Sequence, residues 1–97
     1  MKTITLYFEN PNNPALGGVA NGREVYEKQV RPNINRQTLK GELCIRFPDH
    51  ISIIGDSFIR GFARPMIDEI GWDGVRKRVH FVTCREELTE ELYDGMV

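Results

Sequence analysis

The sequence predicts a small α/β domain with the element order β-α-β-α-β-α, in which a mostly parallel or mixed sheet carries helices packed on it. Short runs rich in β-branched and aromatic residues alternate with segments whose apolar residues recur at helical spacing. This alternation is typical of a sheet covered by helices, and right-handed crossovers would make its central strands parallel. The length of 97 residues fits one hydrophobic core. We therefore expect a single domain over residues 1–97.

The first segment of the chain predicts a strand followed by a loop. Residues 3–8 alternate small polar with large apolar side chains and are rich in β-branched and aromatic types, which indicates a strand. The stretch 9–18, ENPNNPALGG, contains two prolines, three asparagines and two glycines, so we expect a loop there. Residues 33–40 are polar and predict a second connector.

A first helix is expected between these two connectors. Asn21 and Glu24 have the spacing of a capping box, which predicts a helix over about 22–31. Pro32 would end it, because proline cannot continue the hydrogen-bonding pattern of a helix. The residues expected to face the core are Val25, Tyr26 and Val30.

The middle of the chain predicts two strands and the main helix. Residues 42–47 alternate as a strand, with Leu43, Ile45 and Phe47 on one face and Cys44 and Arg46 on the other. The apolar run 51–54 would enter the sheet and lead directly into a helix that starts near Asp56. Pro65 predicts a kink in that helix, and Gly71 predicts its end. The apolar stripe of the helix consists of Phe58, Ile59, Phe62, Met66, Ile67 and Ile70.

The last segment predicts a turn, a strand and a terminal helix. Residues 72–77 form the expected turn, and 78–84 the strand, with Val79 and Phe81 on one face. Thr83 and Glu86 have the spacing of a second capping box. The terminal helix would bury Leu88, Leu92 and Met96 and expose Glu87, Glu90, Glu91 and Asp94.

Composition and motifs argue against catalysis and cofactor binding. His50 and His80 are far apart in the sequence, and no Cys or His pair has the spacing of metal ligands, so no metal site is predicted. The chain contains no GxSxG, phosphate-loop or dinucleotide-binding motif. We therefore expect a protein that is not an enzyme and takes no cofactor.

The same features predict a cytoplasmic location. The first ten residues reach Glu9 and Asn10 before any apolar stretch long enough for export. No segment approaches the roughly 18 apolar residues that a membrane span requires. In the cytosol the two cysteines, Cys44 and Cys84, are expected to be reduced, buried and inert.

Charge gives little reason to expect nucleic acid as a partner. The net charge is -1, from 13 basic and 14 acidic side chains. Arg60 and Arg64 share a helix face, and residues 76–78 are Arg-Lys-Arg, so a basic patch would require these groups to converge. Asp68 and Glu69 are close enough in sequence to pair with the arginines, and the face has no exposed aromatic residue for base stacking.

The most informative residues are Asp56 and Ser57, where the short apolar run meets the main helix. Asp56 is a good N-cap, and its charge suits the positive end of the helix dipole. Ser57 would place a hydroxyl in the first turn, where backbone N–H groups have no partner within the helix. The structural alternative is that both residues only cap the helix.

The run from Leu43 to about Leu92 resembles STAS-like domains, the fold group of anti-sigma-factor antagonists. It is most similar to a STAS-like group in which a strand leads into a Ser-Phe pair that opens an apolar helix. Residues 51–59 align without gaps with the antagonist motif, a strand followed by Asp-Ser-Ser-Gly-Leu. Gly55, Asp56 and Phe58 depart from the aspartate, first serine and glycine of that motif.

The resemblance implies a regulatory module that binds a protein partner, a histidine-kinase-like ATPase, through the surface around Asp56 and Ser57. Ser57 aligns with the serine that partner kinases phosphorylate, and Arg60 and Arg64 extend the expected surface along the helix. A second hypothesis is a small accessory or inhibitor protein whose acidic terminal helix, together with the Pro/Asn loop 9–18, binds a basic target. The sequence also leaves a homodimer through an exposed edge strand open.

Overall fold

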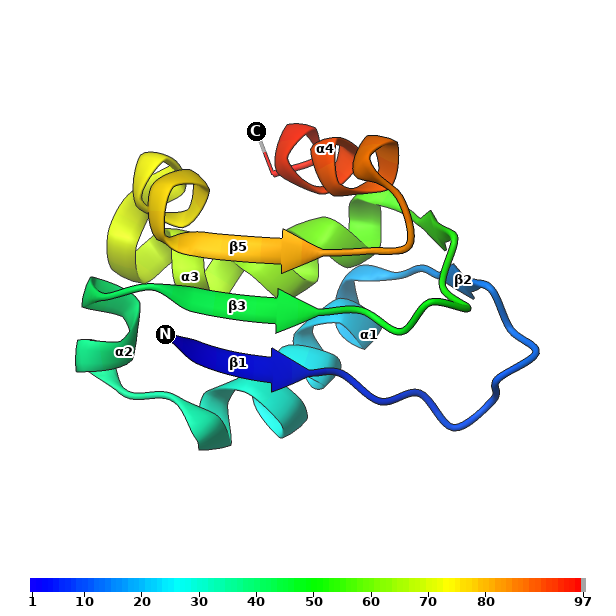
Figure 1. The fold of residues 1–97 in the computed structure, drawn as a ribbon, viewed down its shortest axis with the longest axis horizontal. Coiled ribbons are helices and arrows are strands. Elements are labelled where there is room, and N and C mark those ends of the chain that lie inside the picture. The colour runs from blue at the N-terminus through cyan, green and yellow to red at the C-terminus, as the bar shows by residue number, and fades with distance from the viewer. Residues whose placement is uncertain (97) are drawn as a thin grey trace.

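Three parallel strands form the main sheet of the protein. The computed structural model in Figure 1 describes residues 1–96 of the chain. Strands β1 (Lys2–Thr5), β3 (Leu43–Arg46) and β5 (Val79–Val82) are arranged in the order β1-β3-β5, and both pairs are parallel. The predicted α/β class, with parallel strands and helices packed on the sheet, is confirmed.

Two further strands form a small sheet of their own. β2 (Ala15–Leu16) and β4 (Ile53–Ile54) pair in parallel and do not join the main sheet. The prediction that residues 51–54 enter the sheet is therefore wrong, because only Ile53 and Ile54 form a strand and their partner is β2. β2 lies within the predicted loop 9–18, where two residues between proline and glycine are too few to show a periodic pattern.

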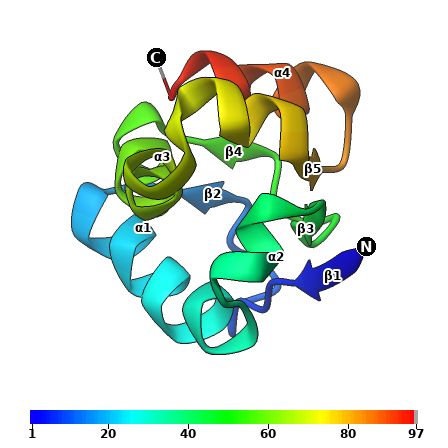
Figure 2. The ribbon, with the colours of Figure 1, turned by 90° about the vertical axis from the view of Figure 1, so that its left-hand side faces the viewer.

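The helices lie mostly on one side of the strands (Figure 2). The helical segments are α1 (Val19–Val25), the π-helix η1 (Tyr26–Val30), the 3₁₀-helix η2 (Arg31–Asn33), α2 (Arg36–Lys40), α3 (Asp56–Arg78) and α4 (Glu86–Asp94). α1 and α3 pack against each other, and α4 lies beside β5 (Figures 1 and 2). Within residues 1–96, no helix is both long enough and apolar enough to span a bilayer.

The core lies between the main sheet and these helices. Ile4, Ile45 and Phe81 form one register row across the three strands, and all three side chains are buried. The predicted inward faces of 42–47 and 78–84 are thereby confirmed. The apolar stripe of α3 is confirmed as well: Phe58, Ile59, Phe62 and Met66 are buried, and Ile67 and Ile70 pack partly buried against the core.

The backbones of α1 and α3 touch at two glycines, one on each helix. A Cβ atom at Gly22 would overlap the carbonyl oxygen of Phe58, and one at Gly61 would overlap the carbonyl oxygen of Val19. Both glycines are buried. Only glycine allows this approach, because any larger side chain would push the two helices apart.

α1 begins earlier than the sequence predicts. Its N-cap is Gly18, which has a φ of 89°, a conformation that glycine adopts without strain. Asn21 therefore lies inside the first turn, and its side-chain amide donates to the carbonyl of Gly17 (3.2 Å). The predicted capping box of Asn21 and Glu24 is wrong for this reason. The helix continues through the π-helical turn η1 and ends in η2, which contains Pro32.

Residues 33–40, predicted as a connector, contain the short helix α2. Its N-cap is Asn35, whose side chain accepts from the backbone N–H of Thr38 (3.0 Å). The hydroxyl of Thr38 in turn accepts from the backbone N–H of Asn35 (3.2 Å). This reciprocal capping box uses threonine where glutamate is usual, and Leu39 anchors the helix in the core.

α3 is longer than predicted and is interrupted at Gly71. Gly71 has φ 77° and ψ 163°, so the helix breaks there and resumes through Arg78. The predicted turn over 72–77 is wrong, because these residues form a further helical segment that buries Gly74 and Val75. The backbone dihedral angles at Pro65 stay helical, so the helix runs through this proline to Gly71.

The start of α4 also differs from its predicted capping box. The N-cap is Arg85, and no side chain caps the helix. The hydroxyl of Thr83 instead donates to the carbonyl of Arg85 (2.7 Å). The predicted inner face is confirmed, since Leu88, Leu92 and Met96 are buried.

A tyrosine from α4 closes the outer edge of β5. The hydroxyl of Tyr93 donates to the carbonyl of Val79 (2.6 Å) and accepts from the N–H of Phe81 (3.3 Å). The rings of Tyr93 and Phe81 meet edge to face, with centroids 5.3 Å apart. Burial raises the pKa of the Tyr93 hydroxyl, which keeps it protonated and able to donate.

We predict that Gly61→Ala destabilises the protein by about 3 kcal/mol or more, because its methyl group would overlap the backbone of α1. Gly17→Ala is the matched control, since a Cβ there meets no atom within 4 Å. We expect this control to change stability by less than about 1 kcal/mol. Urea unfolding followed by circular dichroism measures both, and equal stabilities would contradict the glycine contact.

Candidate functional site

Two strand-to-helix junctions lie side by side and form the candidate site. Because β2 and β4 are parallel neighbours, the chain leaves both strands at the same edge and enters α1 and α3. The N–H of Gly55 donates to the carbonyl of Leu16 (2.8 Å), which extends the pairing to the helix starts. We call residues 17–18 and 55–57 the helix-start junction.

Ser57 links the two halves of this junction. Its hydroxyl oxygen accepts a hydrogen bond from the backbone N–H of Gly18, at 3.1 Å. Gly18 is the N-cap of α1, and Ser57 is the second residue of α3. The side chain of Ser57 is partly exposed. The sequence placed Ser57 correctly at a helix start, but its partner is 39 residues away and could not be inferred.

Asp56 occupies a different position from the one predicted. The N-cap of α3 is Gly55, in an extended conformation, and it makes no side-chain cap. Asp56 is the first helical residue, exposed to solvent. The predicted N-cap at Asp56 is wrong, although its carboxylate still lies at the positive end of the helix dipole.

Arg60 and Arg64 follow Ser57 along α3. Their spacing of three and seven residues places all three on one side of the helix. Both arginines are exposed. Arg64 pairs with Asp68 (3.0 Å), whereas the structure of residues 1–96 gives Arg60 no ion pair. The four predicted site residues thus lie along the first turns of one helix.

Phe58 does not cover the neighbouring serine. Its side chain is completely buried, and its ring stacks on that of Phe62 with centroids 5.8 Å apart. The large residue that replaces the glycine of the antagonist motif therefore belongs to the core. This arrangement leaves the hydroxyl side of Ser57 free of the Phe58 ring.

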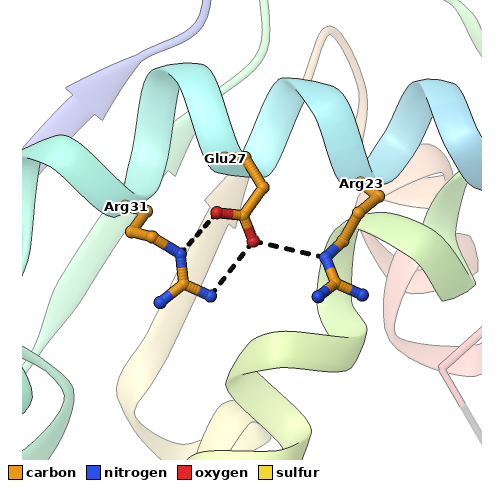
Figure 3. Close-up of polar contacts among 3 residues, drawn as sticks. All are labelled: Arg23, Glu27 and Arg31. Atoms are coloured by element: carbon orange, nitrogen blue, oxygen red, sulfur yellow. Dashed lines mark hydrogen bonds and ion pairs between the residues drawn. The ribbon is translucent and has the colours of Figure 1, made fainter.

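A separate groove of about 440 Å³ lies between the α1–η1 segment, α2 and α3. Two arginines that line it, Arg31 and Arg23, flank the carboxylate of Glu27 at 2.6 and 3.2 Å, as Figure 3 shows. Hydrogen bonds from Arg31 and Arg23 hold the pKa of Glu27 below its ordinary value. Arg31 also lies over the ring of Tyr26, 5.4 Å from its centroid. The side chains of Arg23 and Arg31 therefore already interact with other residues of the protein.

Arg76, near the end of α3, is also engaged within the protein. Arg76 pairs with Glu90 (3.8 Å) and lies over the rings of Trp72 and Tyr93, at 5.6 and 5.2 Å from their centroids. The break at Gly71 separates Arg76 from Arg60.

The two cysteines have different environments. Cys44 is buried, as predicted, but Cys84 is exposed, so the expectation of two buried thiols is wrong for Cys84. His80 is the register partner of Cys44 on the neighbouring strand β5. Its Nε2 atom lies 3.4 Å from the carboxylate of Glu42. Within residues 1–96, no three His, Cys, Asp or Glu side chains form a group that could hold a metal ion.

Comparisons of the chain with models of protein families, with curated proteins and with solved structures gave no match. The resemblance to STAS-like domains therefore depends only on the sequence motif and its spacing.

Proposed function

We propose that this chain is a non-catalytic regulatory module of STAS-like type, which binds a protein partner through the helix-start junction and the adjacent face of α3. The observation that supports this proposal most strongly is the hydrogen bond between the Ser57 hydroxyl and the N–H of Gly18. A single partly exposed side chain thus bridges the starts of two helices. A change at this hydroxyl would therefore act on both helices.

Phosphorylation of Ser57 is the proposed switch. A phosphate would add roughly two negative charges and three acceptor oxygens between the helix starts. The unpaired N–H groups of the first turn of α3 would attract it, and the carboxylate of Asp56 would repel it. The contact with Gly18 would have to rearrange. The proposed partner is a histidine-kinase-like ATPase in the cytoplasm, which would bind one form of Ser57 in preference to the other.

We predict that Ser57→Asp weakens partner binding by about tenfold or more, equal to about 1.4 kcal/mol. The partner is first identified by affinity capture from the native host and mass spectrometry, and its affinity is then measured by calorimetry with purified proteins. Ser57→Ala should retain binding but abolish phosphorylation by the partner.

Ser52 provides the matched control, because it is the other serine of the chain and is also partly exposed. Ser52→Asp and Ser52→Ala should leave the affinity unchanged. If both Ser57 variants bind the partner as the parent protein does, the proposed site is wrong.

The acidic face of α4 favours a second candidate function, binding of a basic target by an accessory or inhibitor protein. Five exposed acidic side chains lie on this short helix: Glu86, Glu87, Glu90, Glu91 and Asp94. Of these, only Glu90 forms an ion pair within residues 1–96, with Arg76. Unpaired carboxylates on one helix present a field that attracts basic surfaces.

If α4 is the binding surface, neutralising Glu87, Glu90 and Glu91 to glutamine should lower affinity and reduce its dependence on salt. The control variant neutralises Glu9, Asp49 and Asp73, which are exposed and without an ion pair within residues 1–96. Both variants change the net charge equally. Equal salt dependence in the two variants would contradict a specific role for α4.

A further inference from the structure

The two outer edges of the main sheet are covered to different extents. The edge of β5 is closed along the strand itself by the Tyr93 hydroxyl, which bonds to Val79 and Phe81. At the edge of β1, the side chain of Gln29 forms hydrogen bonds with the backbone only past the end of the strand, at Tyr7. The N–H of Tyr7 donates to Oε1 of Gln29, and Nε2 of Gln29 donates to the carbonyl of Tyr7, both at 2.8 Å.

The hydrogen-bond pattern shows which groups of β1 point outward. The N–H of Leu6 donates to the carbonyl of Arg46, at 2.9 Å, so the backbone N–H and C=O of Leu6 point toward β3. In a parallel pair, alternate residues direct their N–H and C=O groups to opposite sides. Thr3, Thr5 and Tyr7 therefore direct these groups away from β3. Tyr7 bonds to Gln29, but the structure of residues 1–96 gives the outward groups of Thr3 and Thr5 no partner.

The two hydrogen bonds of the Gln29 side chain imitate those that one residue of an added strand would form. This side-chain amide supplies one donor and one acceptor to a single outward-facing residue, as a neighbouring strand would. Gln29 belongs to the π-helix η1, a type of turn that is frequent at functional sites. A groove of about 390 Å³ continues from this point along the open part of β1, lined by residues 2–5 together with Lys28, Gln29 and Asn33.

We propose that the open edge of β1 binds an extended, acidic segment of a partner protein by strand addition. Thr3 and Thr5 would each supply one donor and one acceptor to the added strand. The charged side chains that line the groove are both basic, Lys2 and Lys28, and no acidic side chain lines it. Lys28 pairs with Glu24 (2.6 Å), but both side chains are largely exposed, so this pair is easily exchanged for a partner carboxylate.

Charge argues against a second copy of this chain as the occupant. Self-pairing of two β1 edges would bring Lys2 and Lys28 of both copies to one groove. Like charges so close are unfavourable, whereas glutamates on an added strand would complement them. This inference does not depend on Ser57 or on the proposed function.

The test uses three short synthetic peptides with the full-length protein: one that alternates glutamate with valine, one that alternates lysine with valine, and the glutamate peptide with N-methylated backbone amides. Amide hydrogen exchange and NMR titration report on each residue. We expect the glutamate peptide to slow exchange at Thr3 and Thr5 by about tenfold or more at saturation, the size of a stabilisation of about 1.4 kcal/mol. The lysine and N-methylated peptides should not.

Two variants separate backbone pairing from charge. Thr5→Pro removes an outward N–H without removing a bond to β3, a substitution that edge strands tolerate. Lys2→Glu with Lys28→Glu leaves the backbone unchanged and keeps the test valid if the proline variant fails to fold. Each should lower affinity for the glutamate peptide by about tenfold or more.

Three outcomes would overturn the proposal. The first is no protection of Thr3 and Thr5 by the glutamate peptide. The second is equal binding of the glutamate and lysine peptides, which would remove the charge preference. The third is protection without peptide that increases with protein concentration, which would identify a second copy as the occupant.

Discussion

The direct backbone contact between α1 and α3 is the constraint on which the rest of the structure depends. Gly22 and Gly61 let each helix reach the carbonyl groups of the other, and no larger residue fits at either position. Because the two helices are held so close, the strands that precede them can pair, and their first turns lie together. The hydrogen bond from Gly18 to Ser57 follows from this spacing. The candidate site is thus a consequence of helix packing.

The elements with strong periodic patterns could be predicted from the sequence. The alternation around Ile45 and the apolar stripe of α3 give their inward faces correctly, because each pattern extends over several residues. β2 and α2 were missed because they are too short to show a period. Their stability comes from partners elsewhere: β2 pairs with β4, and α2 is anchored by Leu39 in the core.

Local capping signals also failed at the starts of α1 and α3. Gly18 starts α1 at a positive φ, so the Asn21 capping signal lies inside the helix. At α3, the N-cap position expected for Asp56 is taken by Gly55, whose extended conformation is open to any residue. The sequence placed the Ser57 hydroxyl correctly at the start of a helix. Its hydrogen-bond partner, the N–H of Gly18, could not be predicted, because only the packing of α1 on α3 brings the two residues together. The open edge of β1 could not be predicted either, because it depends on which backbone groups other elements cover.

The exchange rate of the Gly18 amide tests most directly whether the packing of α1 on α3 brings the Ser57 hydroxyl into a hydrogen bond with the start of α1. Hydrogen exchange in Ser57→Ala, followed residue by residue by NMR, would be compared with the parent protein and with Ser52→Ala. Loss of the acceptor should speed exchange at Gly18 by about tenfold, the change expected for a loss of about 1.4 kcal/mol, while the amides of β3 keep their protection. An unchanged rate at Gly18 in Ser57→Ala would contradict the account.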